Sequence, residues 1–182
     1  AFVNAYFGTL MPKISAAFPD ANIRDAIMSA TQAMIASKVA NKTLRDVFIA
    51  DFEAATGLDF PIVEPLFMDY YQNEYCDVVK VTSRVAHAGA ALQAAQKITP
   101  NVALATIPIF PLIAIEERMR WAGISDFPFA LVTSFEMMHA SKPHPEYYAE
   151  IAYHLNCAPE ECLMIGNDYH DDMIAKAVGM KT

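Results

Sequence analysis

Cysteine is scarce in this sequence, which has only three in 182 residues: Cys76, Cys157 and Cys162. These thiols are too few and too scattered for a disulfide framework, and none of them forms a Cys-x-x-Cys pair. The five histidines likewise lack the spacing of a metal-binding motif. These absences favour a protein of the reducing cytoplasm.

The sequence also has few basic residues and lacks a long apolar run. The chain carries 13 lysines and arginines against 21 aspartates and glutamates, so its net charge is −8. This acidity, with no basic stretch to interrupt it, argues against a nucleic-acid partner. The longest apolar run, residues 103–115, contains Pro108 and Pro111 and is shorter than the about 20 residues that a membrane helix needs. We therefore expect neither a nucleic-acid partner nor a membrane partner.

Apolar residues are abundant, at 54% of the chain, which is enough for a substantial core. In the first half of the chain they recur only at helical spacing. Thr43 and Asp46 have the spacing of a capping pair at the start of one of these helices. The stripes predict four helices around residues 2–14, 23–39, 44–52 and 63–71, followed by a fifth helix at 82–97.

From Asn101 onward the pattern changes to alternating strands and helices. Strands are predicted at 102–106, which we expect to be buried, at 129–133 and at 162–165, and helices at 110–122, 145–155 and 171–178. Such alternation implies a parallel sheet with helices on its faces. The predicted fold class is therefore α/β, a partial doubly wound parallel sheet preceded by an all-α module.

Polar residues stand where the predicted strands end, and open parallel sheets bind their ligands at that edge. A hydroxyl and a backbone N–H suit a phosphoryl oxygen, a lysine neutralises phosphate charge, and carboxylates suit Mg²⁺. The pattern therefore indicates a site for phosphate and metal. The candidates are Thr106 and Ile107 after the first strand, Lys142 after the second, and Asn167, Asp168, Asp171 and Asp172 after the third.

This order of motifs resembles the haloacid dehalogenase-like (HAD) hydrolase superfamily. The second motif of the family, a Thr or Ser at a strand end, is matched by Thr106 in LATIP, and the third, a lysine, by Lys142 in SKPHPEYY. The fourth, an acidic strand end, is matched by GNDYHDD at residues 166–172, and the trailing IAKAVGMKT is similar to the family's Ala-x-x-x-Gly-Met helix. The resemblance covers residues 100–182 well. It implies a helical cap at residues 1–80 and a Rossmann-like core at 81–182.

The family's first motif, Asp-x-Asp-x-Thr/Val, is absent, because no Asp-x-Asp occurs anywhere in the chain. Gly8-Thr9-Leu10 imitates the tail of that motif, but Ala5 and Phe7 occupy the aspartate places within a helical stripe. Ile107 stands where relatives often carry Asn. We therefore expect an upstream segment to carry the nucleophile, the core to be truncated at both ends, and this chain alone to be inactive.

The resemblance implies a Mg²⁺-dependent phosphohydrolase that acts on a small phosphorylated metabolite through an aspartyl-phosphate intermediate. It implies catalytic roles for Lys142 and Thr106, which would bind the phosphoryl group together with Ile107. It also implies that Asp168 and Asp172 bind the metal. Asn167 is an alternative for the first of these two places, and Asp171 is either a further ligand or a helix cap.

The same residues are also compatible with other functions. A 2-haloacid dehalogenase shares the layout but needs no metal, which the carboxylates disfavour. A phosphomutase differs only in its cap, and a non-catalytic relative would lack the nucleophile. A receiver-type signalling domain also combines acids, Thr and Lys on a parallel sheet, but in the reverse order. The sequence carries no signal for one substrate or for an oligomeric state.

Overall fold

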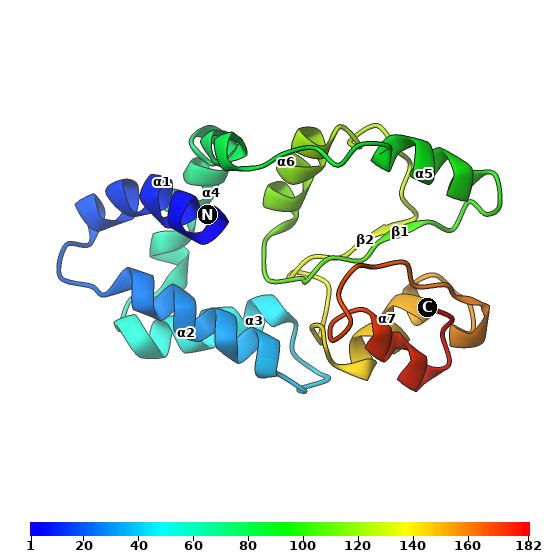
Figure 1. The fold of residues 1–182 in the computed structure, drawn as a ribbon. Coiled ribbons are helices and arrows are strands. Elements are labelled where there is room, and N and C mark those ends of the chain that lie inside the picture. Colours follow the sequence, from blue (N-terminus) through cyan, green and yellow to red (C-terminus); the bar gives the residue numbers. More distant parts are fainter.

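The computed structural model describes all 182 residues and has an all-helical part followed by a part that mixes strands and helices (Figure 1). The four predicted N-terminal helices are confirmed. The second is shorter than expected, since it ends at Ala36 and leaves Val39 outside it with 46% of its surface exposed. The helices are α1 (Phe2–Ala17), α2 (Ile23–Ala36), α3 (Leu44–Thr56) and α4 (Phe60–Asn73).

Local sequence signals set both ends of α3. The Thr43 hydroxyl accepts a hydrogen bond from the Asp46 N–H at 3.2 Å, and the Asp46 carboxylate accepts one from the Thr43 N–H at 3.0 Å. This reciprocal cap satisfies two N–H groups that have no partner inside the helix, and it confirms the predicted pair. At the other end Gly57 has φ +71°, a left-handed conformation that glycine adopts without a steric penalty.

The apolar stripes of these helices meet in one core. Phe52, Tyr70 and Tyr75 are completely buried within it. The hydroxyl groups of Tyr6 and Tyr71 lie 2.9 Å apart, so these two buried phenols satisfy each other. The aromatic and methionine-rich stripes are therefore chiefly core residues, as their spacing predicts.

The helix predicted at 82–97 is only partly present. A short 3₁₀ helix, η1 (Tyr75–Val81), is followed by α5 (Ala88–Gln96), which buries none of its residues. Val85, expected on the apolar face, is 76% exposed and precedes the helix. Without a face to pack, the alanine-rich segment is helical only where its intrinsic propensity is high.

A parallel sheet of two strands confirms the α/β class. β1 (Ala103–Leu104) pairs with β2 (Leu131–Val132), and α6 (Leu112–Ala122) forms the crossover between them. Both strands are shorter than predicted, and β1 is half-buried instead of buried. Each strand pairs only with the other, through Ala103 with Leu131 and Leu104 with Val132.

The predicted third strand, 162–165, is wrong as a strand. Leu163 makes a single parallel bridge with Lys181, in which the Met164 N–H donates to the Lys181 carbonyl at 2.7 Å. With a partner on one side only, Leu163 is 61% and Ile165 79% exposed. The helix expected at 171–178 is a 3₁₀ helix, η3 (Met173–Val178), which leaves Asp171 and Asp172 before its start.

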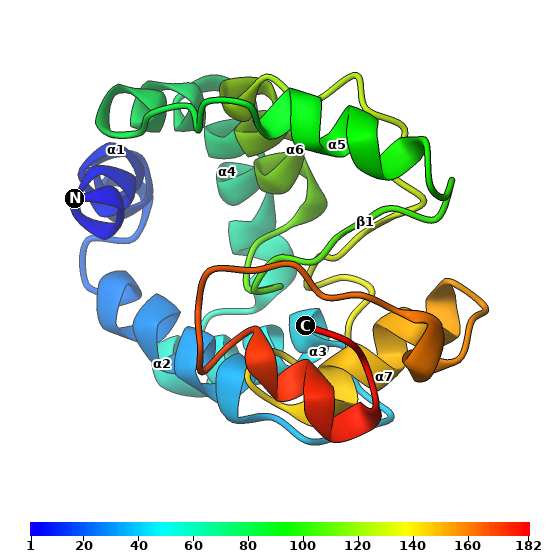
Figure 2. The same ribbon diagram turned by 45° about the vertical axis from the view of Figure 1, so that its right-hand side comes forward.

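The strand ends and the C-terminal segments lie close to the helical part (Figure 2). β2 is followed along the chain by α7 (Pro145–His154), by a short 3₁₀ helix, η2 (Pro159–Glu161), and by η3. α7 packs against η3. The start of α3 is joined to the loop after β2, because the Leu44 N–H donates to the Met138 carbonyl at 2.8 Å. No helix combines the length and the apolar character that a membrane span requires.

Candidate active site

Two threonines meet where β1 and β2 end. The Thr106 N–H donates to Thr133 Oγ1 at 2.9 Å, and the Thr106 hydroxyl donates to the Thr133 carbonyl at 3.3 Å. Thr133 is completely buried, whereas Thr106 is half-buried. The N–H of Thr106 is therefore used within the sheet, and the next N–H along the chain, that of Ile107, donates no hydrogen bond within the chain.

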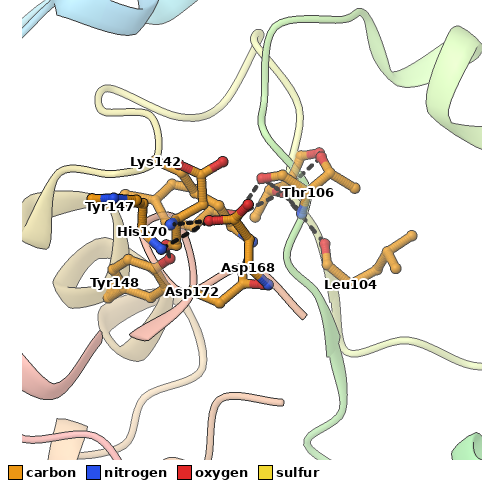
Figure 3. Close-up of polar contacts among 10 residues, drawn as sticks. Leu104, Thr106, Lys142, Tyr147, Tyr148, Asp168, His170 and Asp172 are labelled. Atoms are coloured by element: carbon orange, nitrogen blue, oxygen red, sulfur yellow. Dashed lines mark hydrogen bonds and ion pairs between the residues drawn. The ribbon is translucent and has the colours of Figure 1, made fainter. Parts of the chain in front are cut away.

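A buried ion pair joins the predicted lysine to the predicted acidic loop (Figure 3). Lys142 Nζ donates to Asp172 Oδ1 at 2.6 Å, across 30 positions of sequence. Each of the two side chains is only 7% exposed. Charges removed from water to this degree are tolerated when they are paired and hydrogen-bonded, so this contact connects the turn before α7 with the segment before η3.

Tyr147, in the first turn of α7, connects this ion pair to the strand ends. Its hydroxyl donates to the Thr106 carbonyl at 2.5 Å and lies 3.2 Å from Thr133 Oγ1. Lys142 Nζ lies 5.9 Å from the centroid of its ring. Burial raises the pKa of Tyr147, so its hydroxyl remains a donor. One side chain thus links the predicted phosphate residue Thr106 with the predicted cation (Figure 3).

The acidic loop, residues 166–172, is closed by its own hydrogen bonds. Asp168 Oδ1 accepts the N–H groups of His170 and Asp171, each at 2.8 Å. Asp172 Oδ2 accepts the Asp168 N–H at 3.0 Å. A Cβ atom at Gly166 would overlap the Asp172 carboxylate, so glycine is required there for the loop to fold over this side chain.

These contacts keep Asp172 ionised. Burial by itself favours the neutral acid, but the hydrogen bonds from Lys142 and from the Asp168 N–H outweigh it and lower the pKa of Asp172 below its ordinary value. The neighbouring Tyr148 hydroxyl donates to the Asp171 carbonyl, and burial raises the pKa of this phenol. The loop therefore presents a fixed negative charge beside a fixed positive one.

The carboxylates of the loop differ in their freedom to bind a metal. Asp168 is exposed and its Oδ2 accepts no hydrogen bond within the chain, whereas both oxygens of Asp172 are engaged. No group of three or more His, Cys, Asp or Glu side chains is placed to hold a metal ion. Mg²⁺ commonly uses one or two carboxylates and completes its shell with water and phosphate oxygens. The Oδ2 atom of Asp168 has no hydrogen bond within the chain, and each oxygen of Asp172 accepts one hydrogen bond and keeps a second lone pair, so the donor set is compatible with this ion. The alternatives, Asn167 and Asp171, lie in the same loop, exposed and half-buried respectively.

The structure thus brings Lys142 and Asp172 into contact and connects both to Thr106 through Tyr147. Three residues of this site were not predicted from the sequence: Thr133, Ser141 and Tyr147. Thr133, like Thr106, is the last residue of a predicted strand, and this position could have identified it as a candidate site residue. Ser141 precedes the lysine and is completely buried, with a hydroxyl that has no hydrogen-bond partner.

Part of the chain is similar in sequence to pyrophosphatases from bacteria. The chain is 38% identical over 64 residues to the pyrophosphatase PpaX of Bacillus velezensis, a match covering 35% of this chain and 29% of that protein. The PpaX of Anoxybacillus flavithermus is 37% identical over 64 residues, with the same coverage, and that of Bacillus cereus 32% over 68 residues, covering 37% of this chain and 31% of that protein. The matched stretches span less than a third of these relatives.

A family model covers much more of the chain. The model of the haloacid dehalogenase-like hydrolases matches residues 6–179. This match includes the helical part, both strands, the Lys142–Asp172 pair and the acidic loop, and it agrees with the α/β fold. The chain therefore belongs to the haloacid dehalogenase-like hydrolase family.

Proposed function

We propose that this chain is the phosphate-binding and metal-binding part of a Mg²⁺-dependent phosphohydrolase that acts on a small phosphorylated molecule. The observation that carries the proposal is the buried contact between Lys142 and Asp172, 2.6 Å long, beside the exposed carboxylate of Asp168. A cation and hard oxygen ligands in one place match the needs of a phosphoryl group with its metal. Membership of a hydrolase family supports this chemistry.

Each side chain has a distinct role in the proposal. Lys142 neutralises negative charge on the phosphoryl oxygens, and the pair with Asp172 keeps its ammonium in one position. The Ile107 N–H binds a phosphoryl oxygen, and the Thr106 hydroxyl binds another by exchanging its 3.3 Å hydrogen bond to the Thr133 carbonyl. Asp168 and Asp172 hold Mg²⁺, which when bound shields the charge between phosphate and attacking group.

The attacking group of the proposed reaction is an aspartate, which would form an aspartyl-phosphate with the substrate. The chain holds no Asp-x-Asp pair, and Gly8-Thr9-Leu10 lies inside α1 instead of at a strand end. We therefore assign the activity to the protein that carries this chain together with such an aspartate. In the same proposal residues 1–80 are the cap and residues 81–182 the core.

Phosphate release tests this function. The 182-residue chain alone should not turn over p-nitrophenyl phosphate with Mg²⁺, because a positioned lysine cannot replace a nucleophile. The longer protein with an aspartate motif should release phosphate, and EDTA should abolish the release. Lys142→Ala should remove most activity, while Lys176→Ala, at an exposed lysine of η3, should not.

Two results would count against the proposal. EDTA-sensitive turnover by the chain alone would contradict the need for an external aspartate. A longer protein that folds, binds Mg²⁺ and releases no phosphate from a broad panel of phosphorylated metabolites would contradict phosphohydrolase activity itself.

A further inference from the structure

A large cavity adjoins the strand end that carries Thr106. Its volume is about 510 Å³, and it lies between the helical part and the segment after β1. Thr106 and Ile107 line it together with apolar side chains that include Phe2, Phe48, Met68 and Phe110. Cavities of 300–1,000 Å³ typically enclose organic ligands, so this space is far larger than a phosphate group needs.

The walls of this cavity have little unused hydrogen-bonding capacity. Fifteen of its twenty lining residues are hydrophobic. Glu64 is paired with Arg45 at 2.5 Å, and the Thr31 hydroxyl donates to the Ile27 carbonyl at 2.7 Å. A ligand that fills this space therefore gains mainly from burying apolar surface.

One lining cation has no counterion. The Arg118 guanidinium lies over the rings of Phe2 and Phe110, 5.4 and 5.8 Å from their centroids, and makes no ion pair or hydrogen bond within the chain. Ring faces attract a cation but do not neutralise it. Arg118 is exposed to water and can attract an anionic ligand to this cavity, in which Thr106 and Ile107 are the residues proposed to bind the phosphoryl group.

We propose that the substrate is a phosphate monoester of an apolar, aromatic or branched aliphatic alcohol, whose organic group occupies this cavity. The inference rests on the proposed phosphohydrolase function, because it places the phosphoryl group at Thr106 and Ile107. Pyrophosphate fits the cavity poorly, since its second phosphate would lose hydration among apolar side chains with only Arg118 to compensate. Selectivity for the organic group then comes from the cavity wall, and the strand ends treat all phosphate esters alike.

Binding of non-hydrolysable ligands to the full chain in the presence of Mg²⁺ tests this proposal without requiring turnover. Titration calorimetry should find benzylphosphonate at least about tenfold tighter than methylphosphonate, because the ring is buried in the cavity. Pyrophosphate should bind no more tightly than methylphosphonate. Equal affinities for the two phosphonates, or tightest binding of pyrophosphate, would overturn the proposal.

A matched pair of variants on α4 locates the effect. Met68 lines the cavity and is 36% exposed, whereas Ile62 lies on the same helix outside the cavity and is 63% exposed. Met68→Glu should reduce the preference for the benzyl group about tenfold and leave methylphosphonate binding unchanged, and Ile62→Glu should change neither. Met28→Glu on α2, at another partly exposed lining residue, should repeat the effect if Met68→Glu folds poorly.

Binding of benzyl alcohol distinguishes a failure of the phosphate site from a failure of the apolar cavity. Binding of benzyl alcohol as tight as that of benzylphosphonate would contradict the phosphate site, and so the proposed function, while the apolar cavity would stand. A preference for benzylphosphonate that both glutamate variants retain would leave the phosphate site intact and would show that the cavity does not select the substrate.

Discussion

The Lys142–Asp172 ion pair allows a demanding test, because both side chains are 7% exposed and lie 2.6 Å apart. Asp172→Asn keeps the shape of the side chain and removes its charge. The Lys142 ammonium then remains buried without the carboxylate that is its hydrogen-bond partner within the chain. Breaking a buried pair by removing one partner typically costs about 3–5 kcal/mol of folding free energy.

Urea unfolding of the 182-residue chain measures this loss. With a urea dependence of about 2 kcal/mol per M, a loss of 3–5 kcal/mol lowers the midpoint by about 1.5–2.5 M. Lys142→Met should produce a loss of similar size, because Asp172 then keeps only the Asp168 N–H as a donor. The double variant Lys142→Met/Asp172→Leu leaves no unpaired charge, so it should recover most of the stability of the original chain.

A loss below about 1 kcal/mol in both single variants would contradict the burial of this ion pair, since that is the range of exposed pairs. It would mean that water reaches the ammonium and the carboxylate. A double variant as unstable as either single variant would also contradict it, because the loss would then come from packing and not from an isolated charge.

Three further predictions concern the same site. In the longer protein with a nucleophile, Asp168→Ala should abolish most Mg²⁺-dependent phosphate release and Asp171→Ala should affect it far less; equal losses would assign Asp171 to the metal. Because the folded-state pKa of Asp172 is lowered, its stabilising contribution is complete above its ordinary value of 3.8 and is lost as pH falls through the lower folded-state value. Acid titration of unfolding below about pH 4 should therefore show a steeper loss for the original chain than for the double variant without Lys142 and Asp172. Tyr147→Phe should lower the unfolding free energy by about 1–2 kcal/mol, because it removes the donor to the half-buried Thr106 carbonyl and the hydroxyl contact with the buried Thr133; an unchanged urea midpoint would contradict these contacts.

The helices α1–α4 and the order of the family's motifs could be predicted from the sequence alone. The periodic stripes of α1–α4 and the capping pair Thr43–Asp46 depend on residues three to eight positions apart, so they are legible without a structure. The order of Thr106, Lys142 and the acidic loop after successive strands predicted the α/β class and the family, which the family match confirmed. The stripes and the cap are local, and the order of the motifs runs along the chain, so neither requires knowledge of which residues meet in space.

The tertiary structure decided which distant groups meet and how far each strand extends. The contact between Lys142 and Asp172, the link from Tyr147 to Thr106, and the apolar cavity beside Thr106 join residues that are tens of positions apart. An apolar run such as 162–165 becomes a strand only where a neighbouring segment offers a ladder of hydrogen bonds, and here one bridge to Lys181 forms. Composition predicts that such a segment can pair, but the partner in space determines whether it does.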